Sequence, residues 1–211
     1  MRKAYTKEIQ ASISPAKALE LLKEGNQRFV ANKKEDKDLL DQMNDTSTGQ
    51  YPFATVLSCI DSRVSSELIF DQGIGDIFSA RVAGNIVNED MLGSMEFACK
   101  LAGTKIIVVL GHTSCGAVKG ACDNAKMGNL TALLSKIQPA VEAVKTPSQS
   151  SERTSGNITF VNEVATKNVE LTLKNIRTKS SVLKEMEDKQ EIKLIGGMYN
   201  ISTGRVEFFD A

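Results

Sequence analysis

The 211-residue sequence contains no Trp and a single His, His112. It also lacks an excess of either charge, because Lys+Arg and Asp+Glu each number 26. A balanced charge provides no general attraction to nucleic acid or to an anionic membrane surface. No stretch approaches the roughly 20 apolar residues of a membrane span. We therefore expect neither nucleic acid nor a membrane as a partner, and a small-molecule site remains open.

Cysteine is sparse as well, with four residues scattered along the chain. Such spacing does not resemble the dense disulfide framework of a small secreted protein. The N-terminal stretch has basic residues but no continuous apolar segment of the kind that a signal peptide needs. We expect a cytoplasmic protein whose thiols are free or bound to metal.

Short apolar runs alternate with segments of helical spacing along the chain. The runs at 53–59, 76–84 and 105–111 suit strands that are covered on both faces. Helical spacing marks residues 14–33, 89–103, 115–126, 129–145 and 157–176, and two terminal strands flank a turn at 200–204. This order predicts an α/β fold with a mainly parallel central sheet flanked by helices, an N-terminal helical arm and a C-terminal edge strand.

Three chemically active side chains follow the predicted strands. Cys59 ends the first run, His112 follows the glycine that ends the third, and Cys115 lies where a helix should begin. If the two strands are neighbours, the three side chains converge at the carboxyl edge of the sheet, where ligands gather in parallel sheets. Two thiolates and one imidazole suit Zn²⁺, and three protein ligands leave its fourth position open for catalysis. The helix N-terminus would help to hold Cys115 as a thiolate.

Each of these residues also has an ordinary structural interpretation. A cysteine at the end of an apolar strand is more often a small buried hydrophobe, and a lone histidine is more often a satisfied polar residue. A His-x-x-Cys spacing alone is a weak metal signal. The residue pattern taken alone is compatible with either interpretation.

Asp61 and Arg63 lie in the turn after Cys59. An Asp-x-Arg pair is usually a surface salt bridge of small energetic value. Beside a metal the pair has another use, because Arg63 can keep Asp61 ionised and oriented to accept a hydrogen bond from metal-bound water.

The segments "CIDSRV" and "GHTSCGA" together resemble the paired signature of the β-class carbonic anhydrases, Cys-x-Asp-Ser-Arg and His-x-x-Cys-Gly. The resemblance continues through "GDIFSARVAGNIV" and "GSMEFACKLAG" and covers Gln50 to about Asp123. It implies one domain over residues 1–211, with an N-terminal helical arm at 1–49, the zinc-site core at 50–123, and helices and terminal strands at 124–211.

The resemblance also implies roles for individual residues. Cys59, His112 and Cys115 would hold one Zn²⁺ per subunit, with Asp61 and Arg63 as the catalytic dyad. The residues that would line the substrate pocket are Gln50, Phe78, Ala83, Phe97 and Gly116. Cys99 and Cys122 match no ligand position and are interpreted as buried thiols.

In this family the pocket is built across a dimer interface, so the resemblance implies a homodimer or a dimer of dimers. Phe78 and Phe97 would then serve the neighbouring subunit's zinc, although both are equally compatible with ordinary core positions. Gln50 matches a glutamine of plant-type members, and the absence of Trp removes a residue that some bacterial members use to bind bicarbonate. Both features favour the plant-type subclass and an open site.

The activity implied is the reversible hydration of carbon dioxide by zinc-bound hydroxide. Two thiolate ligands place more negative charge on the metal than imidazoles do, so we expect better activity at alkaline pH. The chain has no second histidine to relay protons, so we expect a strong dependence on buffer.

Three other functions compete with this interpretation. Relatives that hydrolyse carbon disulfide or carbonyl sulfide keep the same zinc site. A non-catalytic zinc protein would not need Asp61, Arg63 or Gln50. A nucleotide-binding α/β domain is a poor alternative, because no complete glycine-rich phosphate motif opens a helix.

Overall fold

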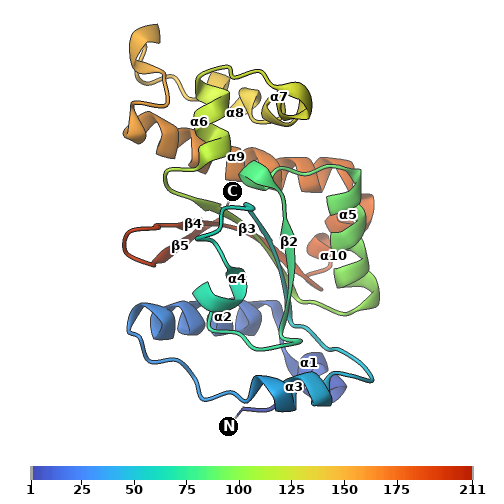
Figure 1. Ribbon diagram of the computed structural model, residues 1–211. Coiled ribbons are helices and arrows are strands. Elements are labelled where there is room, and N and C mark those ends of the chain that lie inside the picture. The colour runs from blue at the N-terminus through green and yellow to red at the C-terminus, as the bar shows by residue number, and fades with distance from the viewer. Residues whose placement is uncertain (1, 211) are drawn as a thin grey trace.

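The computed structural model describes residues 2–210, and its centre is a five-stranded sheet (Figure 1). The strands are β1 Ala54–Ser58, β2 Ile77–Arg81, β3 Ile106–His112, β4 Lys193–Tyr199 and β5 Val206–Phe209. Their spatial order is β2-β1-β3-β4-β5, with parallel pairing except between β4 and the edge strand β5. The predicted mainly parallel sheet and antiparallel C-terminal edge strand are confirmed.

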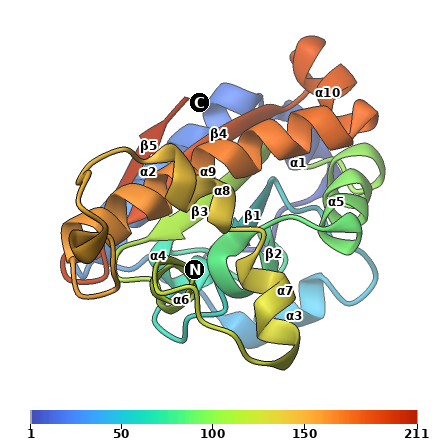
Figure 2. The ribbon, with the colours of Figure 1, turned by 90° about the horizontal axis from the view of Figure 1, so that it is seen from above.

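Helices cover both faces of this sheet, as the view along the layers shows (Figure 2). Helix α2 (Pro15–Val30) and the short α4 (Ser66–Ile69) pack on the face that includes Val56 and Val108. Helices α5 (Glu89–Glu96), α9 (Ile158–Lys179) and α10 (Ser181–Asp188) pack on the face that includes Leu57 and Val109. Successive strand residues therefore enter opposite cores, which explains why β1 and β3 read as continuous apolar runs.

The two ends of the sheet carry different elements (Figure 1). Helices α1 (Lys7–Ser12) and α3 (Leu39–Asp45) lie at the amino ends of the parallel strands. Helices α6 (Gly116–Cys122), α7 (Gly128–Leu134) and α8 (Gln138–Ala143) lie at their carboxyl ends. Short helical turns complete the fold: η1 Ala83–Asn85, η2 Phe97–Leu101 and η3 Ser150–Glu152.

Helix boundaries follow local chemistry. Ser14 caps α2 by accepting a hydrogen bond from the backbone N–H of Lys17, and Pro15 occupies the first turn, as the sequence predicts. The helical stretch that begins at Glu89 ends at Leu101, and Gly103 beyond it has a φ of +85°, which glycine adopts at no steric cost.

The structure differs from the sequence-based expectation in three respects. Helices α1, α4 and α10 were not predicted. The single helix expected over 129–145 is divided into α7 and α8, with Pro139 in the first turn of α8. The strand expected to be covered on both faces at 76–84 is instead the edge strand β2, whose residues are all at least partly exposed.

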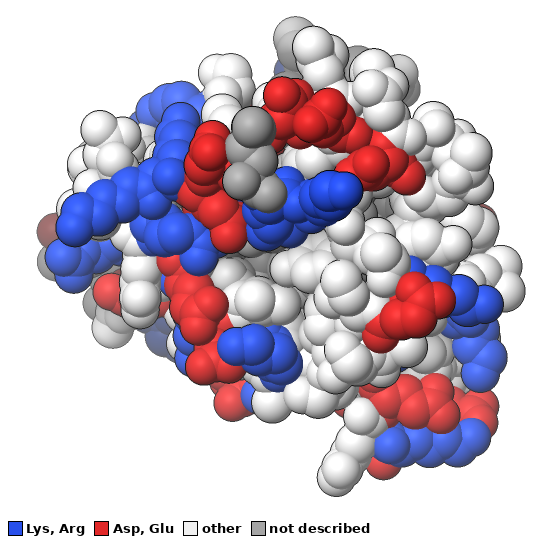
Figure 3. Space-filling view, turned by 90° about the horizontal axis from the view of Figure 1, so that it is seen from below, with Lys and Arg blue, Asp and Glu red and all other residues white. Residues whose placement is uncertain are grey.

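Charged residues of both signs are interspersed on the face opposite that of Figure 2 (Figure 3). This arrangement matches the balanced composition of the chain. Within residues 2–210, no helix combines the length and the apolarity that crossing a bilayer requires.

Candidate metal centre

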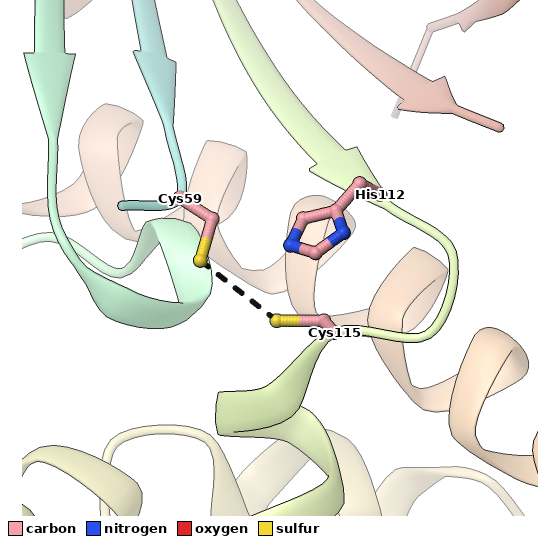
Figure 4. Close-up of side chains that lie close together, drawn as sticks. All are labelled: Cys59, His112 and Cys115. Atoms are coloured by element: carbon pink, nitrogen blue, oxygen red, sulfur yellow. Dashed lines mark hydrogen bonds between the residues drawn. The ribbon is translucent and has the colours of Figure 1, made fainter. Parts of the chain in front are cut away.

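The carboxyl ends of two adjacent parallel strands and the N-terminus of one helix bring Cys59, His112 and Cys115 together. Ser58, the last residue of β1, pairs with Leu110 of β3, so Cys59 and His112 leave the sheet at the same edge. Cys115 follows after a short turn and is the N-cap of α6. Figure 4 shows the two sulfur atoms and the imidazole turned toward a common point. The predicted convergence is confirmed.

The dimensions of this cluster fit zinc. The sulfur atoms lie 4.0 Å apart, and all three ligand atoms lie within 4.8 Å of one another. Tetrahedral zinc with ordinary bond lengths needs ligand atoms about 3.5–3.8 Å apart, a small contraction from this arrangement. All three side chains are buried, and His112 Nε2 has no hydrogen-bond partner among the described residues. A buried imidazole nitrogen without a partner is costly unless it binds a metal.

The other nitrogen of His112 has a partner. Nδ1 lies 3.0 Å from the carbonyl oxygen of Thr113, which can accept a hydrogen bond from an Nδ1–H group. That bond selects the tautomer whose Nε2 lone pair is free to bind a metal.

The two thiols influence each other's ionisation. The hydrogen bond with Cys115 is the main reason why the pKa of Cys59 is lowered, and the nearby His112 ring and the Gly84 N–H assist. The same contact with Cys59, together with burial, raises the pKa of Cys115. Backbone N–H groups of Ala117 and Val118 at the start of α6 lower the pKa of Cys115, as the sequence predicts, but their effect is smaller. Because the two sulfur atoms are in contact, the first ionisation belongs to the pair of thiols.

Asp61 and Arg63 form a two-pronged ion pair at the rim of the cluster. Arg63 Nε and Nη2 lie 2.9 and 2.8 Å from the two carboxylate oxygens, and the Arg63 backbone N–H donates to Oδ1 over 3.0 Å. The hydrogen bond from Arg63 holds the pKa of Asp61 far below its usual range. Asp61 Oδ2 lies 3.9 Å from His112 Nε2, so the carboxylate faces the candidate metal position.

The structure adds supporting residues that the sequence pattern does not reveal. Arg81 donates to the carbonyl oxygens of Cys59 and Asp61 and so braces the loop that carries both. The Gly84 N–H donates to Cys59 Sγ over 3.3 Å, and a Cβ at Gly84 would lie 2.5 Å from Ile137 Cδ1. No motif points to Arg81, because its partners are backbone atoms.

The residues expected to line the pocket fall into two groups. Ala83 lies in η1 beside Gly84, and Gly116 opens α6 next to Cys115 with no heavy atom within 4 Å of a Cβ placed there. Gln50 is exposed and precedes β1, at the opposite end of the sheet from Cys59. Phe78 and Phe97 pack edge to face, with ring centroids 6.3 Å apart, in a groove of about 760 Å³ between β2 and α5. Strand β1 alone spans about 13 Å over its four residue steps, and this length separates the end of the sheet near Gln50 from the end that carries Cys59.

Comparison with known proteins identifies the family. The profile of the carbonic anhydrase family matches residues 54–206, which include the whole cluster. The chain belongs to the carbonic anhydrase family. Carbonic anhydrase 2 of Mycobacterium tuberculosis is 36% identical over 198 residues, covering 93% of this chain and 94% of that protein. Carbonic anhydrase of Pseudomonas aeruginosa is 32% identical over 170 residues, covering 78% and 76% of the two chains.

Solved structures place this carbonic anhydrase in the β class. The β-carbonic anhydrase CafA of Aspergillus fumigatus superposes with a TM-score of 0.72 at 27% identity, covering 92% of this chain and 90% of that one. The predicted family and α/β fold are confirmed, and the cluster of Cys59, His112 and Cys115 is the β-class zinc site.

Proposed function

We propose that this β-class carbonic anhydrase hydrates carbon dioxide reversibly to bicarbonate and a proton at the Cys59, His112 and Cys115 centre. The observation that carries the proposal is the Asp61 carboxylate, held by Arg63 and facing the metal position at 3.9 Å from His112 Nε2. A purely structural zinc site needs no ionised carboxylate at its open side.

Each residue has a distinct task in this proposal. Zinc, when bound, supplies a Lewis acid that lowers the pKa of a coordinated water toward neutrality. Asp61 Oδ2 accepts the hydrogen bond of the attacking oxygen and so directs a lone pair at carbon dioxide. Arg63 fixes the carboxylate by two parallel bonds, so little reorientation is needed at the moment of reaction. Arg81 holds the loop from which Cys59 and Asp61 project.

We also propose the plant-type form of this site. Both Asp61 oxygens are engaged by Arg63, which holds the carboxylate as a hydrogen-bond acceptor and keeps it from becoming a fourth zinc ligand. The presence of Gln50 and the lack of Trp support the same assignment.

We propose further that the pocket is completed by a second copy of the chain, as a homodimer or a dimer of dimers. Gln50 and the ring pair Phe78 and Phe97 lie away from the zinc ligands of their own chain, yet Phe97 is 52% exposed beside the open edge strand β2. A two-fold axis near β2 would let these residues face the partner's centre.

Mixing two impaired variants tests the shared pocket. Asp61→Asn disables the centre of its own subunit, and Gln50→Ala weakens the centre of its partner. A mixed dimer then contains one intact site, so mixing should recover roughly a quarter of the wild-type sites. If Gln50 serves its own subunit, mixing will recover nothing.

We propose that residues 1–211 form a single domain. Its parts are the N-terminal helical arm at 1–49, the zinc-site core at 50–123, and the helices and terminal strands at 124–211. A cytoplasmic location suits a centre with two reduced thiols, and all four cysteines are free.

Stopped-flow assays with carbon dioxide, run beside assays with carbon disulfide and carbonyl sulfide, test the substrate. Fast, zinc-dependent bicarbonate formation supports the proposal. Turnover of the sulfur compounds alone would assign a hydrolase, and bound zinc without any turnover would assign a silent zinc protein.

A further inference from the structure

We propose that Asn162 of α9 is a positioning residue for the zinc ligand His112. It acts through the peptide bond between Thr113 and Ser114. This inference rests on the assignment of zinc to the site and is independent of turnover.

The peptide between Thr113 and Ser114 is held from both sides. Its carbonyl oxygen lies 3.0 Å from His112 Nδ1. Its N–H, which belongs to Ser114, donates to Asn162 Oδ1 over 2.9 Å. The C=O and N–H of a trans peptide point in opposite directions, so rotation of this plane would break both bonds together.

The turn needs this support because its backbone is strained. Ser114 has a φ of +57°, in the left-handed region that disfavours side chains with a Cβ. Such a conformation persists where the surroundings enforce it. The Thr113 N–H donates to the Tyr199 carbonyl and the Thr113 hydroxyl accepts from the Ile201 N–H, so β4 and the turn after it anchor the residue before the peptide. Asn162 anchors the residue after it.

The consequence reaches the metal through the imidazole. The Thr113 carbonyl fixes both the ring orientation and the tautomer of His112, whose Nε2 faces the two sulfur atoms (Figure 4). Groups that orient a metal ligand in this way affect metal affinity by about 10- to 100-fold. Loss of the Asn162 acceptor should therefore weaken zinc binding although Asn162 is not one of the three ligands.

A matched pair of variants tests this role. Asn162→Leu keeps the approximate size but removes the acceptor, whereas Asn162→Asp keeps an acceptor at the same position. Glu163→Ala changes the exposed next residue of α9 and controls for effects on the helix. In competition with a chromogenic chelator, Asn162→Leu should bind zinc about 10- to 100-fold more weakly, and the other two should stay close to wild type. If Asn162→Leu fails to fold, Asn162→Ala makes the same comparison.

The single histidine supplies a second readout. Nitrogen-15 spectra of the untagged protein contain one imidazole, so they report the His112 tautomer directly. The zinc-loaded wild type should show a proton on Nδ1 that exchanges slowly, and Asn162→Leu should show faster exchange. Adding Ser114→Gly to Asn162→Leu should restore part of the affinity, because glycine adopts a positive φ freely.

Wild-type zinc affinity and an equally protected Nδ1 proton in Asn162→Leu would overturn the inference while leaving the zinc assignment intact. A double variant that binds no better than Asn162→Leu would overturn the proposed route through the strained peptide. A folded wild-type protein that binds no zinc would overturn the assignment on which the inference rests.

Discussion

Asp61 Oδ2 lies 3.9 Å from His112 Nε2, close to the metal position, and accepts a hydrogen bond from Arg63 Nη2 over 2.8 Å. The carboxylate is thus near enough to accept a hydrogen bond from an oxygen on the metal, and it is restrained from moving closer. This relationship connects the loop after β1 with the end of β3, and the proposed chemistry depends on it.

Replacing Asp61 by Asn should separate zinc binding from activity. The variant keeps the size of the side chain and all three metal ligands, so its zinc content should remain at one per chain. Turnover should fall by about 100-fold or more, because the ionised acceptor is lost. Stopped-flow hydration on protein of measured zinc content gives the result, and normal turnover would exclude Asp61 from the mechanism.

Replacing Arg63 by Leu should lower activity without changing the shape of its pH profile between about pH 6 and 9. Arg63 depresses the pKa of Asp61, and without it that pKa should rise toward the usual value near 4. Asp61 then stays ionised at neutral pH, so the roughly 10- to 100-fold loss reflects misorientation alone. If the loss of activity at acid pH moved into the neutral range in Arg63→Leu, this would contradict the prediction that Asp61 stays ionised there.

The same shift makes a prediction about acid stability. Because the folded-state pKa of Asp61 lies below the unfolded value, the pair stabilises the fold above about pH 4 and ceases to do so as the pH falls further. The difference in unfolding midpoint between wild type and Asp61→Asn should therefore shrink as the pH is lowered below 4. A difference in unfolding midpoint that grows as the pH falls below 4 would contradict the lowered pKa of Asp61.

Cys59→Ser should lose zinc and lower the melting temperature, because metal binding is linked to folding. Cys122→Ser is the matched control, since Cys122 is a half-buried thiol outside the cluster. Metal analysis and thermal melts, with and without a chelator, check both variants. Equal zinc content in the two variants would remove Cys59 from the ligand set.

Turnover should depend strongly on buffer concentration. His112 is buried within the cluster and is the only histidine of the chain, so protons must leave through Asp61 or water. Raising the concentration of an imidazole-type buffer at constant pH and ionic strength should raise the maximal rate. A rate indifferent to buffer would refute this proton path.

The convergence of the three zinc ligands was predictable because strand ends in a parallel sheet share an edge, and the order of apolar runs marks those ends. Cys59 directly follows the buried strand β1, and His112 is the last residue of the buried strand β3. Their assignment to zinc depended on the resemblance of the two motifs to the β-class signature. The edge position of β2 was not predictable, because "IFSAR" has a composition that suits either an edge or an interior strand.

The supporting residues were hidden for a different reason. Arg81 and Asn162 act on backbone atoms of loops that are distant in sequence, and such partners leave no residue pattern. The strain at Ser114 is likewise invisible in the sequence, where glycine or asparagine would have signalled a positive φ. The placement of Gln50 relative to the centre depends on the fold of the whole sheet.

Titrating zinc into the metal-free protein while following carbon dioxide hydration tests the central claim most directly. We predict that turnover rises in proportion to bound zinc up to one ion per chain, and that Asp61→Asn binds the same amount while remaining almost inactive. Stoichiometric zinc binding by the wild type without hydration at neutral or alkaline pH would contradict the account.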